Sequence, residues 1–93
     1  MTLGKYLKEA RKKSGMTQRR VADHFGWATS QYVSNWERDK TYPALYLLPD
    51  LAALYHLDYT DLANRVAADA LKRRESFIVK GFGGELPKGV SVL

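Results

Sequence analysis

Residues 16–38 contain two short helical patterns joined at a glycine, and this stretch constrains the fold more than any other part of the chain. Thr17 can cap the first pattern, because its hydroxyl can accept from the free N–H groups of a first helical turn. One narrow apolar face follows, formed by Val21, Ala22 and Phe25. Gly26 then stands where a helix ends most easily, in a left-handed conformation. The stretch predicts a helix, a turn and a second helix.

The second helix has an apolar inner side and a polar outer side. Thr29 or Ser30 can cap it, and its inward positions are Val33 and Trp36. Its outward positions carry mainly hydroxyl and amide groups, on Ser30, Gln31, Ser34 and Asn35. Two helices arranged in this way can hold the second against a DNA duplex, where Gln and Asn pair bidentately with adenine. The alternative interpretation is a set of ordinary solvated side chains.

Charge is spread unevenly over the 93 residues, which carry a net charge of +5. Residues 1–20 hold seven Lys or Arg against one acidic residue, whereas residues 41–71 hold four Asp against one Arg. A molecule with a basic half and an acidic half would present one face to phosphates. A solvated helix face explains a lysine run equally well. The length allows one domain with a single modest core.

Three further helices are predicted from apolar spacing and from capping residues. Thr2 can cap a helix at the start of the chain. A strongly apolar helix starts near Leu48, since Pro49 is tolerated in a first turn where its missing N–H leaves no bond unmade. Asp58 can cap a last helix that extends to about Arg74. The expected fold class is therefore all-α, a compact bundle of five helices.

The pattern changes after Arg74. Residues 76–80 are β-prone, and the glycines that follow would break a helix. We therefore expect a helical domain over residues 1–74 and an extension over residues 75–93 that contains a short strand. The extension is too apolar for an inert tail, so it should pack on its own domain, on a second copy or on another protein. An exposed strand edge tends to pair with its symmetry mate, and the dimer contacts expected on this basis are Phe77, Ile78 and Val79.

Other kinds of protein are disfavoured by what the sequence lacks. It contains no cysteine, so neither a disulfide framework nor a thiolate metal site is available. His24 and His56 have no partner at a metal-like spacing. No apolar run approaches the roughly 20 residues of a membrane span, and no signal peptide is evident. We expect a cytoplasmic protein that is not an enzyme and has no metal, cofactor or membrane partner.

Several short segments together carry a resemblance to a known family. They are Leu3-Gly4, Arg11-Lys12, Gly15-Met16-Thr17-Gln18, Val21-Ala22, Gly26, Val33-Ser34-Asn35-Trp36-Glu37-Arg38, Pro43, Leu51-Ala52 and Leu54. From Leu3 to Leu62 the chain resembles the phage-repressor/Cro-like (XRE-type) helix-turn-helix family of DNA-binding regulators. That resemblance implies a lambda-repressor-like five-helix bundle that binds operator DNA as a twofold dimer. The chain departs from the family in a turn one residue longer and in Asp39, where the family usually has Gly.

The resemblance also implies roles for single residues. Gln18 is similar to the family's phosphate-contacting glutamine, and Gln31 and Asn35 are similar to its base readers. Glu37 is expected to be a structural acceptor that ties the helix end to a nearby arginine or backbone N–H. The full set of expected base contacts is Ser30, Gln31, Ser34 and Asn35. The expected contacts to the DNA backbone are Gln18, Arg19, Tyr32, Arg38 and Lys40.

Two function classes remain open at this point. The first is a sequence-specific regulator of transcription, a repressor that occupies a palindromic operator of double-stranded DNA as a homodimer. The second is an antitoxin-type or other interaction protein, whose C-terminal tail binds a protein partner. Residues 75–93 distinguish them, because self-association supports the first class and capture of another protein supports the second.

Overall fold

The computed structural model of the chain describes the backbone of residues 1–81 and the side chains of residues 1–73. All regular secondary structure in the described part is helical, with no strand, which confirms the all-α fold class. A short 3-10 turn, η1 (Leu45–Leu47), precedes the fourth helix. The α-helices are α1 (Leu3–Lys13), α2 (Gln18–His24), α3 (Gln31–Glu37), α4 (Leu48–Leu54) and α5 (Tyr59–Gly81).

Three of the helices begin at capping residues that the sequence predicted. Thr2, Thr17 and Asp58 each accept a hydrogen bond from the backbone N–H three residues later, at 3.2, 3.1 and 2.8 Å. Each of these bonds satisfies one N–H group that the first helical turn leaves without a partner. Pro49 lies in the first turn of α4, as expected. The local chemistry of the chain therefore sets where these helices start.

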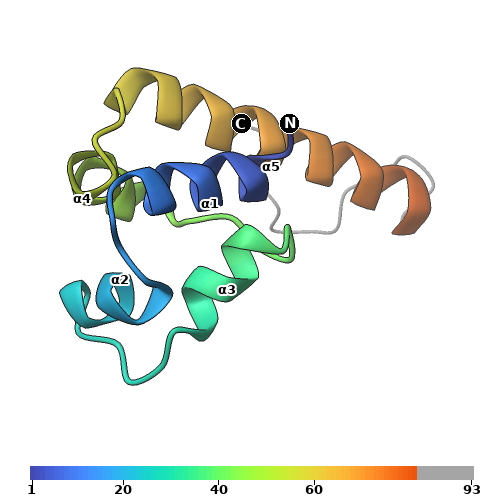
Figure 1. Ribbon diagram of the computed structural model, residues 1–93. Coiled ribbons are helices and arrows are strands. Elements are labelled where there is room, and N and C mark those ends of the chain that lie inside the picture. Colours follow the sequence, from blue (N-terminus) through green and yellow to red (C-terminus); the bar gives the residue numbers. More distant parts are fainter. Residues whose placement is uncertain (82–93) are drawn as a thin grey trace.

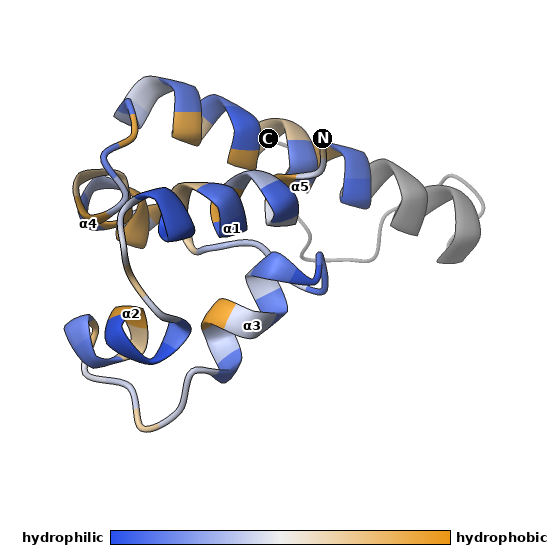
Figure 2. Ribbon diagram, viewed as in Figure 1, coloured by the Kyte–Doolittle hydropathy of each residue, from blue (hydrophilic) through white to orange (hydrophobic). Residues whose placement is uncertain are grey.

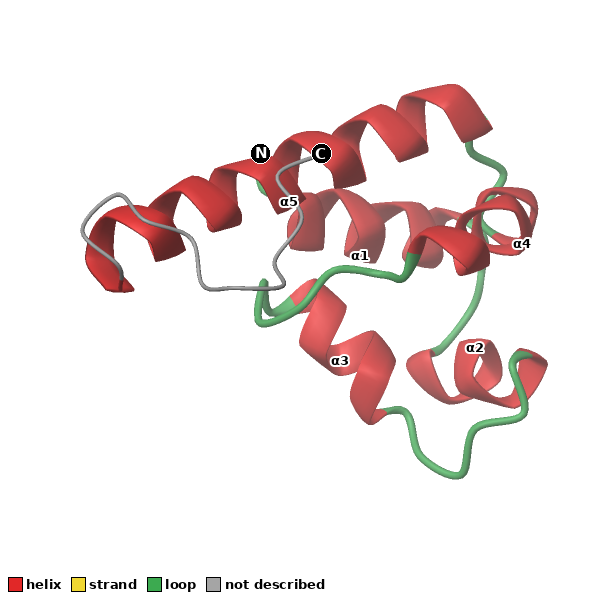
Figure 3. Ribbon diagram, turned by 180° about the vertical axis from the view of Figure 1, so that it is seen from behind, coloured by secondary structure: helices red, strands yellow, loops and turns green. Residues whose placement is uncertain are grey.

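Helix α1 lies at the centre of the bundle. In Figure 1 it runs between α5 on one side and the α2–α3 pair on the other, with α4 at one end, and Figure 3 shows the same arrangement from behind. Hydrophobic residues of α5 face α1 in Figure 2. Every α-helix contributes to one buried cluster, whose fully covered members include Leu7, Val21, Val33, Leu48, Leu51, Leu62 and Val66. Burial of each such side chain contributes about 1.5–3 kcal/mol.

The C-terminal part of α5 corrects one expectation. A strand was predicted over residues 76–80, but α5 continues through them to Gly81 and is 23 residues long. Extending an existing helix fixes one residue per hydrogen bond, so β-branched and aromatic residues add on at little cost. The predicted boundary between residues 74 and 75 lies inside α5. The separate roles of residues 1–74 as the DNA-binding domain and of residues 75–93 as the dimer or partner contact stay predictions. The rest of the expected extension, residues 82–93, lies outside the described residues.

The start of α1 and the end of α3 approach each other very closely at Gly4. A Cβ atom on Gly4 would lie 2.6 Å from the Glu37 carbonyl oxygen and 2.7 Å from that of Trp36. The Gly4 N–H donates to Asp39 Oδ1 at 2.9 Å. Asp39 itself has a φ of 58°, so it adopts the left-handed conformation that a glycine would adopt more easily. The carboxylate that departs from the family pattern thus holds the two helices together.

We predict that Gly4→Ala lowers the free energy of unfolding by about 2 kcal/mol, because the new methyl group would push two backbone carbonyls apart. Helix propensity alone predicts the opposite, a gain of about 1 kcal/mol for alanine over glycine. Urea denaturation followed by circular dichroism measures the difference. In the control, Gly15→Ala, the added Cβ would meet no atom within 4 Å. That variant should lose only the roughly 1–2 kcal/mol of a left-handed alanine. A Gly4→Ala protein as stable as the parent would contradict the close contact.

Candidate nucleic-acid interface

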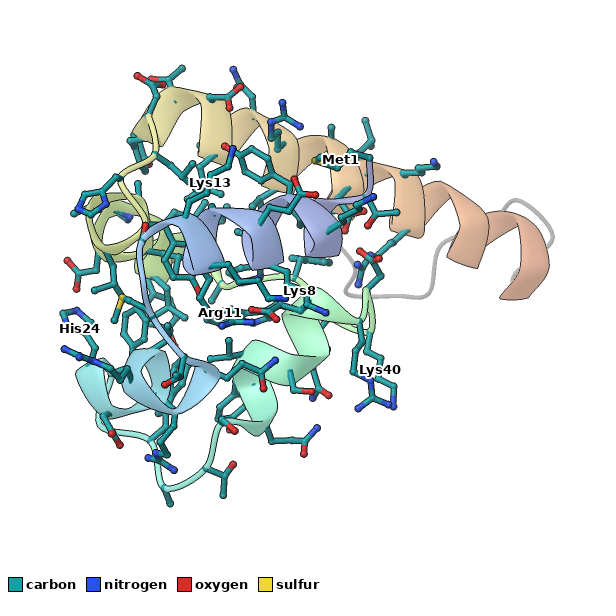
Figure 4. All side chains as sticks on the ribbon, viewed as in Figure 1. Met1, Lys8, Arg11, Lys13, His24 and Lys40 are labelled. Carbon is teal, nitrogen blue, oxygen red and sulfur yellow. The ribbon has the colours of Figure 1, made fainter. Side chains whose placement is uncertain are left out.

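A buried carboxylate joins three helices beneath the polar surface of α3. Glu37 Oε2 lies 2.6 Å from Arg11 Nε, and Glu37 Oε1 accepts from Arg11 Nη2 at 3.1 Å and from Gln18 Nε2 at 3.0 Å. Arg11 Nη1 donates to the Met16 carbonyl at 2.8 Å. The side chains of Arg11 and Glu37 are only 9% and 3% exposed. Their hydrogen bond raises the pKa of Arg11, and Figure 4 shows Arg11 between α1 and α3. The expected structural role of Glu37 is confirmed.

Helix α3 divides its residues between core and surface as the pattern predicted. Val33 is fully buried and Trp36 is 4% exposed, so both anchor the helix in the core. Tyr32 is 58% exposed, and Gln31 is exposed as well. Partial exposure is shared by the three other polar residues of this surface, Ser30, Ser34 and Asn35.

The two amide side chains of α3 are bonded to each other. Gln31 Nε2 donates to Asn35 Oδ1 at 2.9 Å, across one turn of the helix. At the start of α3, Thr29 Oγ1 accepts from the Gln31 N–H at 3.2 Å, whereas Ser30 makes no side-chain capping bond. The N-cap position is Ser30, so the side-chain bond to the first turn of α3 comes from Thr29, one residue before the cap.

The residues expected to contact the DNA backbone lie in different surroundings. Arg38 and Lys40 are exposed just beyond the end of α3, and Figure 4 shows Lys40 pointing away from the bundle. Gln18 is half-buried against Glu37. Tyr32 leans on Trp27, with ring centroids 4.9 Å apart. The structure thus brings these side chains to the side of the bundle formed by α2 and α3, and their DNA contacts stay predictions.

Arg19 has a set of partners that sequence reasoning missed. Its Nε donates to Asp23 Oδ1 at 2.9 Å. Its Nη1 donates to the Ala28 carbonyl at 3.0 Å, and its Nη2 donates to the Trp27 carbonyl at 2.8 Å. The sequence signal for the first contact was the spacing of Arg19 and Asp23, one helical turn apart. Nothing in the sequence indicated the two carbonyls.

The turn between α2 and α3 is packed by aromatic rings. Trp27 stacks on Phe25 with centroids 4.9 Å apart, and meets Trp36 edge-on at 5.7 Å. Trp36 is the buried member of the group. The inward position predicted for Trp36 is confirmed, and through Trp27 the rings connect the turn to the core of the bundle.

The described residues were also expected to lack a metal site and a membrane-spanning segment. The described part of the chain holds no cluster of three His, Cys, Asp or Glu side chains able to bind a metal ion. None of the helices described here is long and apolar enough to cross a membrane. The expected dimer contacts Phe77, Ile78 and Val79 lie on the helical backbone of α5, where side chains are not described, so this prediction is untested.

Comparisons with known proteins agree with this geometry. The model of a helix-turn-helix family matches residues 7–62, which include α2, α3 and α4. The chain is similar to the HTH-type transcriptional regulator ImmR of Bacillus subtilis (strain 168), with 36% identity over 86 residues. The aligned part covers 77% of this chain and 67% of that relative. No solved structure is significantly similar to the chain. The chain belongs to the XRE-type helix-turn-helix family of DNA-binding transcriptional regulators.

Proposed function

We propose that the chain is a sequence-specific repressor that binds a palindromic operator in double-stranded DNA as a homodimer. The observation that carries the proposal is α3, which anchors Val33 and Trp36 in the core and leaves an amide pair at the surface. The name of the ImmR relative describes it as a transcriptional regulator, and the proposal extends that role to this chain. The proposed role involves no catalysis and no cofactor, and places the protein in the cytoplasm with its DNA.

Gln31 and Asn35 are the proposed readers of base edges. One hydrogen of Gln31 Nε2 is held by Asn35, and the second hydrogen and Oε1 can pair with N7 and N6 of an adenine. The bond between the two side chains restricts their rotamers before DNA binds, which reduces the ordering entropy lost on association. Ser30 and Ser34 flank this pair and are proposed as additional base contacts.

Contacts to phosphate would set the position of α3 in the major groove. Arg38 and Lys40 are exposed at the C-terminal end of α3, and Tyr32 is exposed near its start. Gln18 retains a second amide hydrogen beyond the one given to Glu37. We propose that these four side chains flank the duplex backbone. Arg19 was also expected among them, but its guanidinium is bonded to Asp23 and to two loop carbonyls.

The C-terminal half of α5 is the proposed dimer surface. Its buried residues Leu62 and Val66 lie in the first two turns, whereas Leu71 is 60% exposed. The position of Ile78 follows that of Leu71 by two helical turns, so the apolar register continues toward the end of α5. A twofold dimer through this half would match a palindromic site. Helix packing now replaces the strand pairing inferred from the sequence.

Replacing either amide reader should impair recognition. We expect Gln31→Ala or Asn35→Ala to weaken binding to the preferred site by about 1–3 kcal/mol and to relax selectivity at one or two base pairs. Because the two side chains are bonded to each other, the double variant should lose less than the sum of the two. Selection of sites from random DNA, followed by titration, measures both effects. Asn64→Ala, an exposed amide on α5, is the control. Unchanged affinity and selectivity in either reader variant would refute the assignment.

Lys40 should contribute to DNA binding without contributing to sequence choice. We expect Lys40→Ala to weaken the preferred and random duplexes alike, and to reduce the slope of log affinity against log salt by about 0.9. Lys13→Ala removes the same charge from the end of α1 on the side toward α5 (Figure 4) and should leave the slope unchanged. Titrations at several salt concentrations test this. A changed sequence preference with the parental slope would argue against a phosphate contact.

The oligomeric state tests the C-terminal surface. We expect the full chain to sediment as a dimer at tens of micromolar, above a working dissociation constant of about 1 μM (~8 kcal/mol). Deleting residues 75–93 should leave the helical bundle folded, since Val66 is the last buried core residue among those whose side chains are described. That deletion should give a monomer, and Ile78→Asp should do the same. The control Ser76→Asp adds the same charge at a position on a different face of the helix, and should leave the dimer intact. A full-length monomer would rule out the dimer and favour the alternative of a protein partner.

A further inference from the structure

The loop from Phe25 to Ser30 sets the start of α3, and few bonds within the backbone hold its second half. The Trp27 N–H donates to the Ala22 carbonyl at 2.9 Å, and the Gly26 N–H donates to the Asp23 carbonyl at 3.1 Å. These bonds secure the first half of the loop to α2. The carbonyls of Trp27 and Ala28 lie at the middle of the loop, between this secured part and the start of α3.

Those two carbonyls are held by one side chain. Arg19 reaches both of them, at 2.8 and 3.0 Å, from the first turn of α2. Asp23 accepts from Arg19 Nε at 2.9 Å and so aligns the guanidinium with the loop. A guanidinium can bridge in this way because its donors project from one rigid plane, whereas the ammonium of lysine is a compact point charge. The arrangement depends on arginine at this position.

We propose that Arg19 is a positioning residue for DNA recognition, which holds the loop that sets where Gln31 and Asn35 meet the bases, rather than a phosphate contact. This inference rests on the proposed function of α3 as the reading helix. The start of α3 follows Ala28 by only three residues, so movement of the Ala28 carbonyl displaces Gln31 directly. The role expected from the sequence and the role proposed here make different predictions for the same variants.

Arg19→Lys separates the phosphate role from the positioning role, because it keeps the positive charge and loses the planar set of donors that bridges the two carbonyls. Lysine would serve well as a phosphate contact, so the phosphate role predicts parental affinity and salt slope. The positioning role predicts roughly tenfold weaker binding to the selected site, the size expected for loss of one hydrogen bond to a charged group. Binding to random duplex should stay unchanged, because it depends on charge alone.

Asp23→Ala gives predictions of opposite sign. If Arg19 contacted phosphate, removing the neighbouring carboxylate would strengthen binding to all DNA. If Arg19 positions the loop, the variant should weaken binding to the selected site a few-fold and leave the random duplex unchanged or slightly tighter bound. Arg20→Ala is the control for a change of charge without a change at the loop, because it removes an exposed arginine one residue away and should weaken the selected and the random duplex alike.

The experiment uses the full chain, the duplex selected by the parent protein and a random duplex, each titrated at several salt concentrations. Hydrogen exchange of the Gln31 backbone N–H in the free protein gives a second readout. Its exchange rate should increase in Arg19→Lys and in Asp23→Ala, but not in Arg20→Ala. A parent that selects no site would overturn the proposed function itself. A selective parent with an equally selective and equally protected Arg19→Lys variant would overturn only the positioning role.

Discussion

The fold around the reading helix depends on the buried carboxylate of Glu37. A buried charge is tolerated only when it is paired, and removing one partner of such a pair costs about 3–5 kcal/mol because the other charge is left stranded. Glu37 meets this requirement with two bonds from Arg11 and one from Gln18. Three helices therefore converge on one side chain. Because an arrangement of α1, α2 and α3 that separated these donors from Glu37 would leave a buried carboxylate unpaired, the network favours the observed arrangement.

The two ends of α3 are held by different physical means. At its C-terminal end, the hydrogen bonds of Glu37 are supplemented by the hydrogen bond between Gly4 and Asp39. There the backbones of α1 and α3 approach too closely for a side chain at position 4. At its N-terminal end the contacts are nearer the surface, since Arg19 and Asp23 have side chains 49% and 61% exposed. Exposed ion pairs contribute little to stability. The first end therefore serves the stability of the bundle, and the second serves the position of the amide pair.

Much of the site could be anticipated from residue types and spacing. The caps Thr2, Thr17 and Asp58, the buried positions Val33 and Trp36 and the exposed Gln31 follow from hydrogen-bonding chemistry and helical periodicity, which are local. The end of α5 could not be anticipated in this way. Residues 76–80 favour a strand by composition, but the helix that precedes them reaches through this segment to Gly81. Local preference is weak beside the advantage of extending a formed helix.

The sequence by itself determined the order of the five helices, the capping residues of three of them and the apolar and polar sides of α3, because each of these depends on residues within one or two turns of one another. Only the tertiary structure decided which arginine pairs with Glu37, 26 residues away from Arg11 along the chain. It also decided that Asp39 receives the Gly4 amide and that Arg19 reaches two loop carbonyls. Such partners are chosen by how helices pack, and packing brings together groups whose separation in sequence carries no signal.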